Sequence, residues 1–558
     1  MRNKAKNGPI SLQAIAGSYV VLLGIDMEEE SSKGVLGFAI ERIDHSDGDD
    51  RRWLPNFKTF KGVDVPADGT VSTDEHPLQT FLWGDFATRK GHEYTYRVVA
   101  MRGEPGHLRQ GESVEVRVAM EDEAQGTHAV YFNRGVAGSQ AYVNKFGNRR
   151  PDEVPDREAW RWLSRGLFRA LLDFIGKAQG SKYGLRAAVY EFTQPAVVGA
   201  FADARRSGAD VKIIFDARQV INEEDPKKSK LEPAESNREA IEKAGIQDIC
   251  IERTANPRDI SHNKFVVLLE DGRPVEVWTG STNMTDGGIF GHSNVGHVVR
   301  DPRVAAEYLA YWDKLSTDPE MNRSREGDEI RPWNEETSPV PMGDPPEDSI
   351  ITIFSPRRTL EALEWYAKRM DSASTGVFIT AAFGINDLFE EVLANPKEYL
   401  RYVLLESEDE DMERLIESEN NRVAVGRTLE ENRFERWLKE QLTDLNRHVK
   451  YIHTKYMLID PLGQDPIIIS GSANFSDDST RRNDENMLVI RGDTRVADIY
   501  LGEFMRLFNH FYFRSVVGGL GDGPSDPEAG HLKSTDVWRE PYYREGSPKY
   551  KERLYFAG

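Results

Sequence analysis

Cysteine is almost absent from this chain of 558 residues, in which Cys250 is the only one. A single thiol cannot form an internal disulfide, which excludes a fold that depends on such bridges and favours a reducing compartment. Because Cys250 stands between two isoleucines, we expect a small buried apolar residue there and not a reactive thiol.

Long apolar runs and an excess of positive charge are missing as well. No stretch approaches the roughly 18 apolar residues that a membrane span needs, and the apolar run near the N-terminus is interrupted by polar residues, unlike a signal peptide. A net charge of -21 argues against a surface that coats nucleic acid or anionic membrane, but it says little about a local cleft. We therefore expect a cytoplasmic protein without stable membrane insertion.

What the sequence does contain is an internal repeat. His262 and Lys264 precede one apolar run, and His453 and Lys455 precede another at an offset of 191 residues (453 minus 262). A Gly-Ser-x-Asn element follows each pair at the same offset, with the polar members Ser281, Asn283, Ser472 and Asn474. A shared period of this size indicates that one large unit has been duplicated. Since related halves can pack about an approximate two-fold axis, we predict that the four basic side chains converge on one site.

The pattern along the chain predicts five parts. Short alternating runs separated by Gly, Asp and Pro are typical of an antiparallel β-sandwich of immunoglobulin or fibronectin type, and strands that alternate with helices predict a sheet covered on both faces. The predicted parts are a β-sandwich at 1–123, a first α/β half at 124–316, a polar linker at 317–349, a second α/β half at 350–515 and an aromatic tail at 516–558 packed on the body. Apolar spacing further predicts one long helix over 156–179 and another that ends at Gly208.

The two basic stretches resemble the paired His-x-Lys motifs of the phospholipase D superfamily, each with its downstream Gly-Ser-x-Asn. The resemblance covers about residues 128 to 514. It implies an α/β fold made of a pseudo-two-fold pair of phospholipase D-like α/β/α sandwich halves. It also implies a phosphodiesterase that needs no metal or cofactor and acts through a phosphohistidine.

The resemblance also implies roles for individual residues. His262 is the expected nucleophile and His453 the acid, which then activates water, and imidazoles suit both tasks because their pKa lies near neutrality. The lysines and asparagines stabilise oxygens that gain charge, and a strand-end serine hydroxyl bonds the backbone or the phosphate. The expected catalytic residues are His262, Lys264, His453, Lys455 and Glu485, the phosphate-binding residues are Asn283, Asn474, Ser281 and Ser472, and Asp460 supports the site.

The first half departs from the superfamily pattern at two positions. Leu269 stands where the second half has Asp460, and Asn294 stands where it has Glu485. In the superfamily such a carboxylate often orients the histidine of the opposite half, so Glu485 is predicted to hold His262. His292 and His297 are poorly spaced for a metal pair, and structural or solvated histidines are favoured.

The motifs leave the substrate open. The expected location favours a nucleic-acid phosphodiester, and hence a nuclease, while a phospholipase D acting on phosphatidylcholine is the alternative. A third hypothesis is a scaffold with a decayed site whose β-sandwich recruits a partner protein. Both His/Lys pairs and both asparagines are present, which disfavours that hypothesis.

Overall fold

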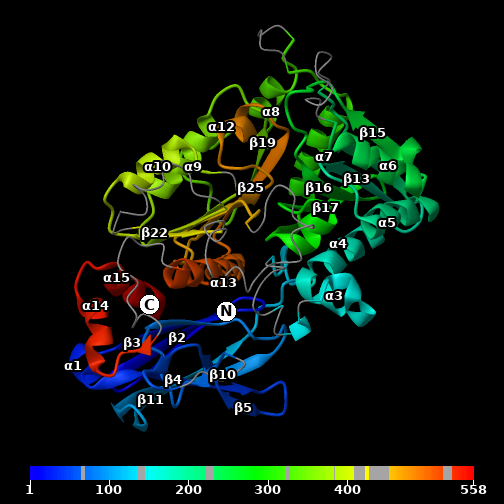
Figure 1. The fold of residues 1–558 in the computed structure, drawn as a ribbon. Helices are drawn as coiled ribbons and strands as arrows, with labels where there is room; N and C mark the ends of the chain where they lie inside the picture. The colour runs from blue at the N-terminus through cyan, green and yellow to red at the C-terminus, as the bar shows by residue number, and fades with distance from the viewer. Residues whose placement is uncertain are drawn as a thin grey trace.

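The computed structural model describes residues 1–63, 69–135, 142, 145–147, 149–220, 231–321, 327–382, 384–406, 421–426, 452–518 and 531–558, with the backbone alone at 513–518. Three sheet-containing bodies make up this part of the chain. Two α/β halves lie side by side, and the N-terminal strands lie beneath them, with α13 (Thr494–Gly518) between (Figure 1).

The N-terminal region forms two antiparallel four-stranded sheets around one apolar core. Alternation of buried and exposed residues, as in the second part of β11, turns one face of the sheet inward. The first sheet has the order β1-β2-β3-β9, with β1 (Arg2–Asn7), β2 (Ile10–Ala16), β3 (Val21–Met27) and β9 (Leu82–Asp85). The second has the order β11-β10-β4-β5, with β4 (Val35–Asp44), β5 (Asp50–Trp53), β10 (Glu93–Glu104) and β11 (His107–Ala119). The assignment of this N-terminal domain to the immunoglobulin or fibronectin type stays a prediction.

The two α/β halves contain seven-stranded sheets with the same topology, which confirms the predicted pair of halves. The first has the order β12-β18-β17-β16-β13-β14-β15, with β12 (His128–Phe132), β13 (Tyr183–Val189), β14 (Asp210–Asp216), β15 (Cys250–Arg253), β16 (Lys264–Glu270), β17 (Arg273–Gly280) and β18 (Val295–Val299). The second has the order β19-β25-β24-β23-β20-β21-β22, with β19 (Ile350–Ser355), β20 (Gly376–Ala381), β21 (Leu400–Leu405), β22 (Asn421–Val425), β23 (Tyr456–Ile459), β24 (Ile467–Gly471) and β25 (Glu485–Arg491). In both, parallel strands at one edge join antiparallel strands.

Helices cover the outer face of each sheet and fill the space between the halves. The outer helices are α3 (Glu158–Ser164), α4 (Leu167–Gly176), α5 (Pro195–Arg206) and α6 (Ala234–Ala244) in the first half, and α9 (Glu361–Asp371) and α10 (Asp387–Ala394) in the second. Between the halves, α7 (Pro302–Ser316) packs on β17 and reaches β19, while α13 packs on β22 and reaches β12. Each helix therefore touches the first strand of the opposite half. Their aromatic residues, including Tyr308 and Tyr500, lie in one shared core.

The single long helix predicted over 156–179 is wrong, because the chain breaks between α3 and α4. Arg165 and Gly166 both have positive φ, at 44° and 94°, a backbone conformation that a continuous helix does not allow. The break turns the Arg165 side chain toward α13, where it forms a buried ion pair with Glu503 at 2.5 Å. The second predicted helix is confirmed as α5, which is capped by the Gln194 side chain and is followed by Gly208 at φ 98°.

The C-terminal residues join the N-terminal domain. Trp538 and Tyr542 lie in the core of the two N-terminal sheets, and β26 (His531–Leu532) pairs with β7 (Thr59–Phe60). The helix α15 (Pro548–Ala557) packs on β3 so closely that a Cβ at Gly24 would come 2.0 Å from the Phe556 carbonyl oxygen. The short elements α1 (Glu29–Ser32), β6 (Pro55–Asn56), β8 (Val71–Ser72) and α14 (Glu540–Tyr543) complete this region, and α8 (Arg331–Thr337) lies within the predicted linker.

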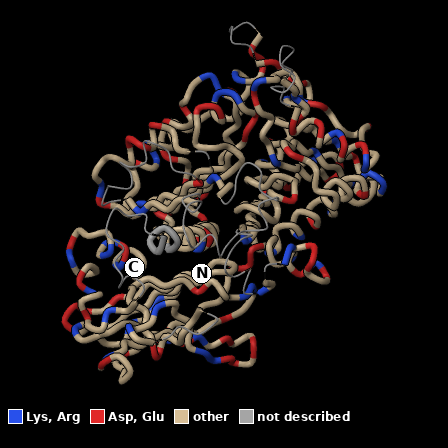
Figure 2. Tube along the Cα trace, viewed as in Figure 1, with Lys and Arg blue, Asp and Glu red and all other residues tan. Residues whose placement is uncertain are grey.

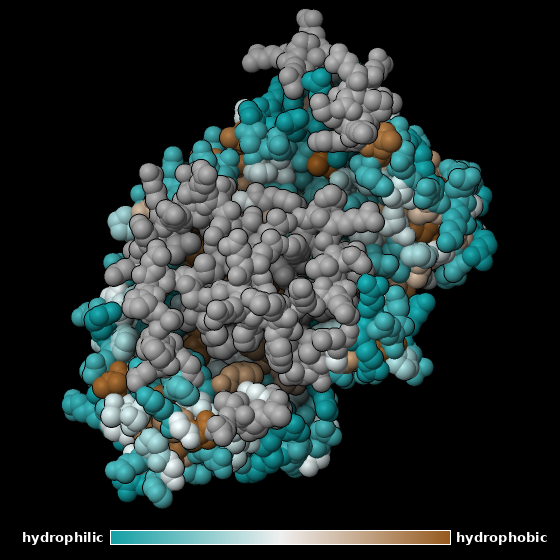
Figure 3. All heavy atoms as spheres, in the orientation of Figure 1, coloured by the Kyte–Doolittle hydropathy of each residue, from teal (hydrophilic) through white to brown (hydrophobic). Residues whose placement is uncertain are grey.

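Acidic and basic residues are interspersed over the outer elements of all three bodies (Figure 2). The described residues on the face shown in Figure 3 are mostly hydrophilic. Within the described ranges, no helix has the length and apolar character required to cross a membrane.

Candidate active site

The two halves are joined by reciprocal backbone bridges next to the basic motifs. Ser261 pairs with Asp484, and Ile452 pairs with Ser293; the repeat offset of 191 converts either bridge into the other. The His262 N–H donates to the Asp484 carbonyl at 3.0 Å, and the Asp484 N–H donates to the Ile260 carbonyl at 2.9 Å. Each histidine is thus held where its segment crosses to the opposite half.

These bridges bring the two predicted histidines together. The ring centroids of His262 and His453 are 6.5 Å apart, and their planes meet at 76°. Both histidines and both lysines, Lys264 and Lys455, are buried. The four basic residues predicted to converge on one site therefore do lie close together.

Each imidazole is oriented by a side chain from the opposite half. His262 Nδ1 contacts the Glu485 carboxylate at 2.9 Å, and His453 Nδ1 contacts Asn294 Oδ1 at 2.9 Å. Carboxylate and amide oxygens only accept hydrogen bonds, so Nδ1 carries the proton in both rings. This arrangement leaves Nε2 of each ring with its lone pair when the ring is neutral.

Burial keeps both imidazoles neutral. Desolvation lowers the pKa of His262 to about 4, against the opposing effect of the Glu485 carboxylate. Desolvation also lowers the pKa of His453 far below its ordinary value, and the Lys455 ammonium lowers it further. The neighbouring carboxylate thus favours a positive charge on His262, and His453 has only a neutral amide in the same position.

The two lysines lie beside the histidines, where burial disfavours their protonated form. Burial lowers the pKa of Lys264 to about 7, and burial together with Lys264 lowers the pKa of Lys455 well below its usual range. Lys264 Nζ donates to the His262 carbonyl, and Lys455 Nζ donates to the His453 carbonyl at 2.7 Å. An anion bound between them would raise both pKa values.

The predicted phosphate-binding residues are two asparagines and two serines. Asn283 donates from its side chain to the Glu191 carboxylate, and the Asn474 backbone N–H donates to Ser479 Oγ at 3.2 Å. Ser281 Oγ donates to Asn294 Oδ1 at 2.7 Å, and Ser472 Oγ accepts from the Asn486 N–H at 3.0 Å. Both serine hydroxyls are fully buried and fix the layer behind the histidines, and their contact with a phosphate stays a prediction.

Asp460 lies at the other end of β23 from His453. Its carboxylate accepts hydrogen bonds from the N–H groups of Ser374, Thr375 and Gly376, so it fixes the turn before β20. The support that it gives is therefore structural. Leu269, its counterpart in the first half, is a buried core residue of β16.

Several residues at the site were not selected from the sequence. The Tyr190 ring lies 5.0 Å from the His262 ring, the His292 ring lies 4.6 Å from the His453 ring, and Ser479 Oγ donates to Glu485 at 3.1 Å. The repeat offset of 191 relates His292 to Asn483 and Asn294 to Glu485. This relation was the signal in the sequence that could have placed His292 and Asn294 at the site. Among the residues that the structure describes, no group of three or more His, Cys, Asp or Glu is placed to hold a metal ion.

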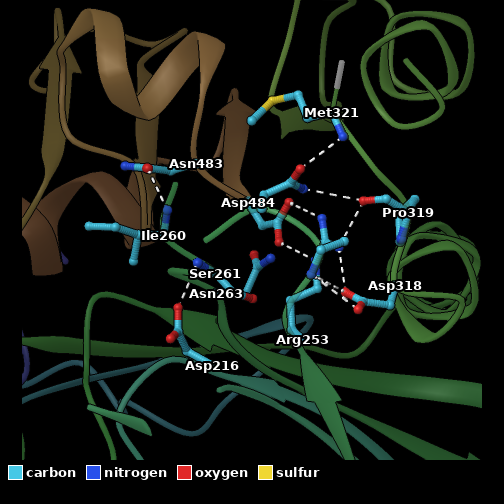
Figure 4. Close-up of polar contacts among 12 residues, drawn as sticks. Asp216, Arg253, Ile260, Ser261, Asn263, Asp318, Pro319, Met321, Asn483 and Asp484 are labelled. Carbon is cyan, nitrogen blue, oxygen red and sulfur yellow. Dashed lines mark hydrogen bonds and ion pairs between the residues drawn. The ribbon is translucent and has the colours of Figure 1, made fainter. Parts of the chain in front are cut away.

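A buried ionic cluster fixes the chain just before His262 (Figure 4). Arg253 donates from Nε to Asp484 at 2.9 Å and from Nη1 to Asp318 at 2.7 Å. The Ser261 N–H donates to the Asp216 carboxylate at 3.0 Å, whose pKa burial raises to about 6. These contacts join β14, β15, the segment after α7 and the second half at one point.

Comparison with known families agrees with this geometry. The family described as "Cardiolipin synthase, PLD-like domain" matches residues 171–316 and 401–508, which cover most of both α/β halves. Each half of the duplicated region therefore resembles a phospholipase D-like domain. No curated protein shows significant sequence similarity to the chain.

Similar solved structures include three enzymes or enzyme-family members. Phosphatidylserine synthase from Haemophilus influenzae Rd KW20 is 12% identical with a TM-score of 0.42, and the match covers 63% of this chain and 87% of that one. Polyphosphate kinase from Porphyromonas gingivalis is 12% identical with a TM-score of 0.36, over 60% of this chain and 46% of the kinase. The phospholipase D family member Nuc from Salmonella typhimurium is 26% identical with a TM-score of 0.21, over 27% of this chain and 87% of that one. We infer no substrate from similarities this low.

Proposed function

We propose that this protein is a metal-independent phosphodiesterase that acts through a phosphohistidine, with a nucleic-acid strand as its substrate. The observation that carries the proposal is the meeting of His262 and His453 across the pseudo-two-fold axis, with ring centroids 6.5 Å apart. The match of both halves to a phospholipase D-like domain family supports action on a phosphodiester.

The reaction divides into two displacements at one phosphorus. In the first, His262 Nε2 forms a bond to phosphorus while the bond to the leaving oxygen breaks, and protonated His453 gives its Nε2 proton to that oxygen. In the second, His453 takes a proton from water, the water oxygen bonds to phosphorus, and the bond to His262 breaks. The two lysines stabilise the charge that builds on the phosphoryl oxygens.

The asymmetry of the orienting side chains supports this division of roles. A phosphorylated His262 carries positive charge on its ring, and the Glu485 carboxylate at 2.9 Å stabilises that charge. His453 must hold its proton only while a substrate is bound, and the negative phosphodiester then raises its pKa. A neutral partner such as Asn294 lets that proton leave again.

Replacing His262 tests the chemistry. We expect the His262→Ala variant to lose cleavage of bis(4-nitrophenyl) phosphate by at least about a thousandfold in buffer with EDTA, since removal of a nucleophile typically costs that much. His107→Ala serves as the matched control, because His107 is an exposed histidine of β11 and its loss should leave the rate unchanged. Full activity of the His262 variant would rule out the mechanism.

The alternative substrate is a phospholipid, which is favoured by the description of the matching family as a cardiolipin synthase domain. Purified protein in EDTA, tested on labelled single-stranded DNA, duplex DNA, RNA and phosphatidylcholine vesicles, separates the two. We expect cleavage of a nucleic acid. Cleavage of the vesicles alone would assign the same chemistry to a lipid.

A further inference from the structure

An arginine-lined cavity lies at the junction of the two halves. Its volume is about 300 Å³, and its described lining consists of Asp259, Met321, Arg331, Arg358, Arg481 and Arg482. These residues come from the segment before His262, the segment between the halves and the second half. The described lining thus holds four arginines and one aspartate. Each arginine also has an acidic partner: Asp328 for Arg331, Glu335 for Arg358, Asp477 for Arg481, and Asp259 and Asp478 for Arg482.

The arginines keep hydrogen-bonding capacity for an anion. Arg481 pairs with Asp477, and Arg358 pairs with Glu335, but the arginine side chains are 46% and 51% exposed, and such exposed pairs contribute little to stability. Each guanidinium has five N–H donors in a planar fork. Arg481 uses two of its nitrogens on Asp477, so donors remain that match the oxygens of a phosphate.

The cavity lies close to the candidate active site along two chain segments. Asp259 precedes His262 by three residues, and Arg482 precedes Glu485 by three, so each pair of Cα atoms is at most about 11 Å apart. An ion pair of 2.7 Å between Arg482 and Asp259 ties the segments together. A smaller cavity shares these two residues and is also lined by Ser261, directly before the histidine.

We propose that the arginine cavity binds a second phosphate of a nucleic-acid strand whose scissile phosphodiester lies between the two histidines. This inference rests on the proposed function. A strand carries a phosphate about every 3.4 Å of helix axis, so a neighbouring phosphate falls within the span between cavity and site. Phosphatidylcholine has only the phosphate that reacts, so the cavity favours strands over that lipid. Contacts to phosphate position a strand without reading its sequence.

Paired substrates test the proposal. One is a dinucleotide with a single phosphodiester, and the other is the same dinucleotide with an added phosphate on either terminal hydroxyl. We expect kcat/KM of the wild-type protein to be about tenfold or more higher for one of the phosphorylated forms. The Arg358→Gln, Arg481→Gln variant should lose that preference, and the Arg358→Lys, Arg481→Lys variant should keep part of it.

Two controls make the outcomes distinct. Arg169→Gln removes an exposed arginine that pairs with Asp173 on α4 and should keep the full preference, and thermal unfolding reports whether each variant is folded. If the wild-type protein cleaves neither dinucleotide and does not cleave bis(4-nitrophenyl) phosphate, the proposed function fails. If it cleaves the dinucleotides without any preference, or if the glutamine variant is folded and keeps the preference, the cavity is not a phosphate site. The proposal would also be overturned if the wild-type protein cleaved phosphatidylglycerol vesicles in preference to the dinucleotides, and if the glutamine variant lost that preference while the lysine variant and Arg169→Gln kept it.

Discussion

Two imidazoles that come from the same repeated motif have surroundings that differ in charge, because a carboxylate orients one and an amide orients the other. Glu485 gives His262 a charged acceptor, and Asn294 gives His453 a neutral one, at the same distance of 2.9 Å. A charge next to a buried ring changes its pKa far more than a dipole does. In the proposed mechanism, this difference in charge accounts for the different roles of the two histidines.

Removing the charge of Glu485 should separate these roles. In Glu485→Gln the His262 pKa, already lowered to about 4, falls further because the carboxylate that favours the charged ring is gone. The reaction needs a neutral His262, so activity falls on acidification through its pKa, and the acid limb of kcat/KM should move to lower pH. We also expect kcat to drop by about 10- to 100-fold.

The mirror-image variant controls for this effect. Asn294→Asp adds a carboxylate beside His453 and not beside His262, so the acid limb should stay in place. If the acid limb of the pH profile of kcat/KM moves equally in both variants, or moves in neither, the assignment of Glu485 to His262 is contradicted.

At the scale of elements, the crossing between the halves depends on the ionic cluster around Arg253. This side chain at the end of β15 is 4% exposed and pairs with Asp484 of the second half and with Asp318 after α7. Its replacement leaves a buried carboxylate without its partner. We therefore expect Arg253→Met to lower the free energy of unfolding by roughly 3–5 kcal/mol, as measured by urea denaturation.

An exposed ion pair provides the contrast for that experiment. Arg169→Met removes an arginine that pairs with Asp173 within α4, with 80% and 55% of the two side chains exposed. We expect a change within about 0.5 kcal/mol. Equal effects of the two substitutions would show that the Arg253 cluster does not hold the halves together.

Some helices and strands were predictable from the sequence, and the break between α3 and α4 was not. Apolar runs with constant spacing predicted the paired sheets and α5, because burial on a covered sheet leaves a local pattern. The break between α3 and α4 was missed because apolar spacing continues through it, and the only local signal was Gly166, whose φ of 94° favours glycine. At this break, Arg165 forms an ion pair with a residue far along the chain, Glu503 of α13. A choice made by tertiary contacts overrides local helix propensity.

At the scale of the whole molecule, the repeat offset made the site predictable before any contact was known. A single number related both motifs, and it also relates Ser261 to Ile452 and Ser293 to Asp484, the four residues that form the reciprocal bridges. The arginine cavity was not predictable in this way. Its lining comes from four separate stretches of the sequence, and only the packed halves bring those residues together.

The most direct test is a crystal structure of the protein with orthovanadate, which imitates a phosphoryl group during displacement. The proposed mechanism predicts one vanadium bonded to His262 Nε2, with His453 Nε2 on the opposite side within hydrogen-bond distance of a vanadate oxygen and both lysines on its remaining oxygens. A vanadate that binds elsewhere, or that contacts only one of the two imidazoles, would contradict the proposal that both histidines act on a single phosphorus.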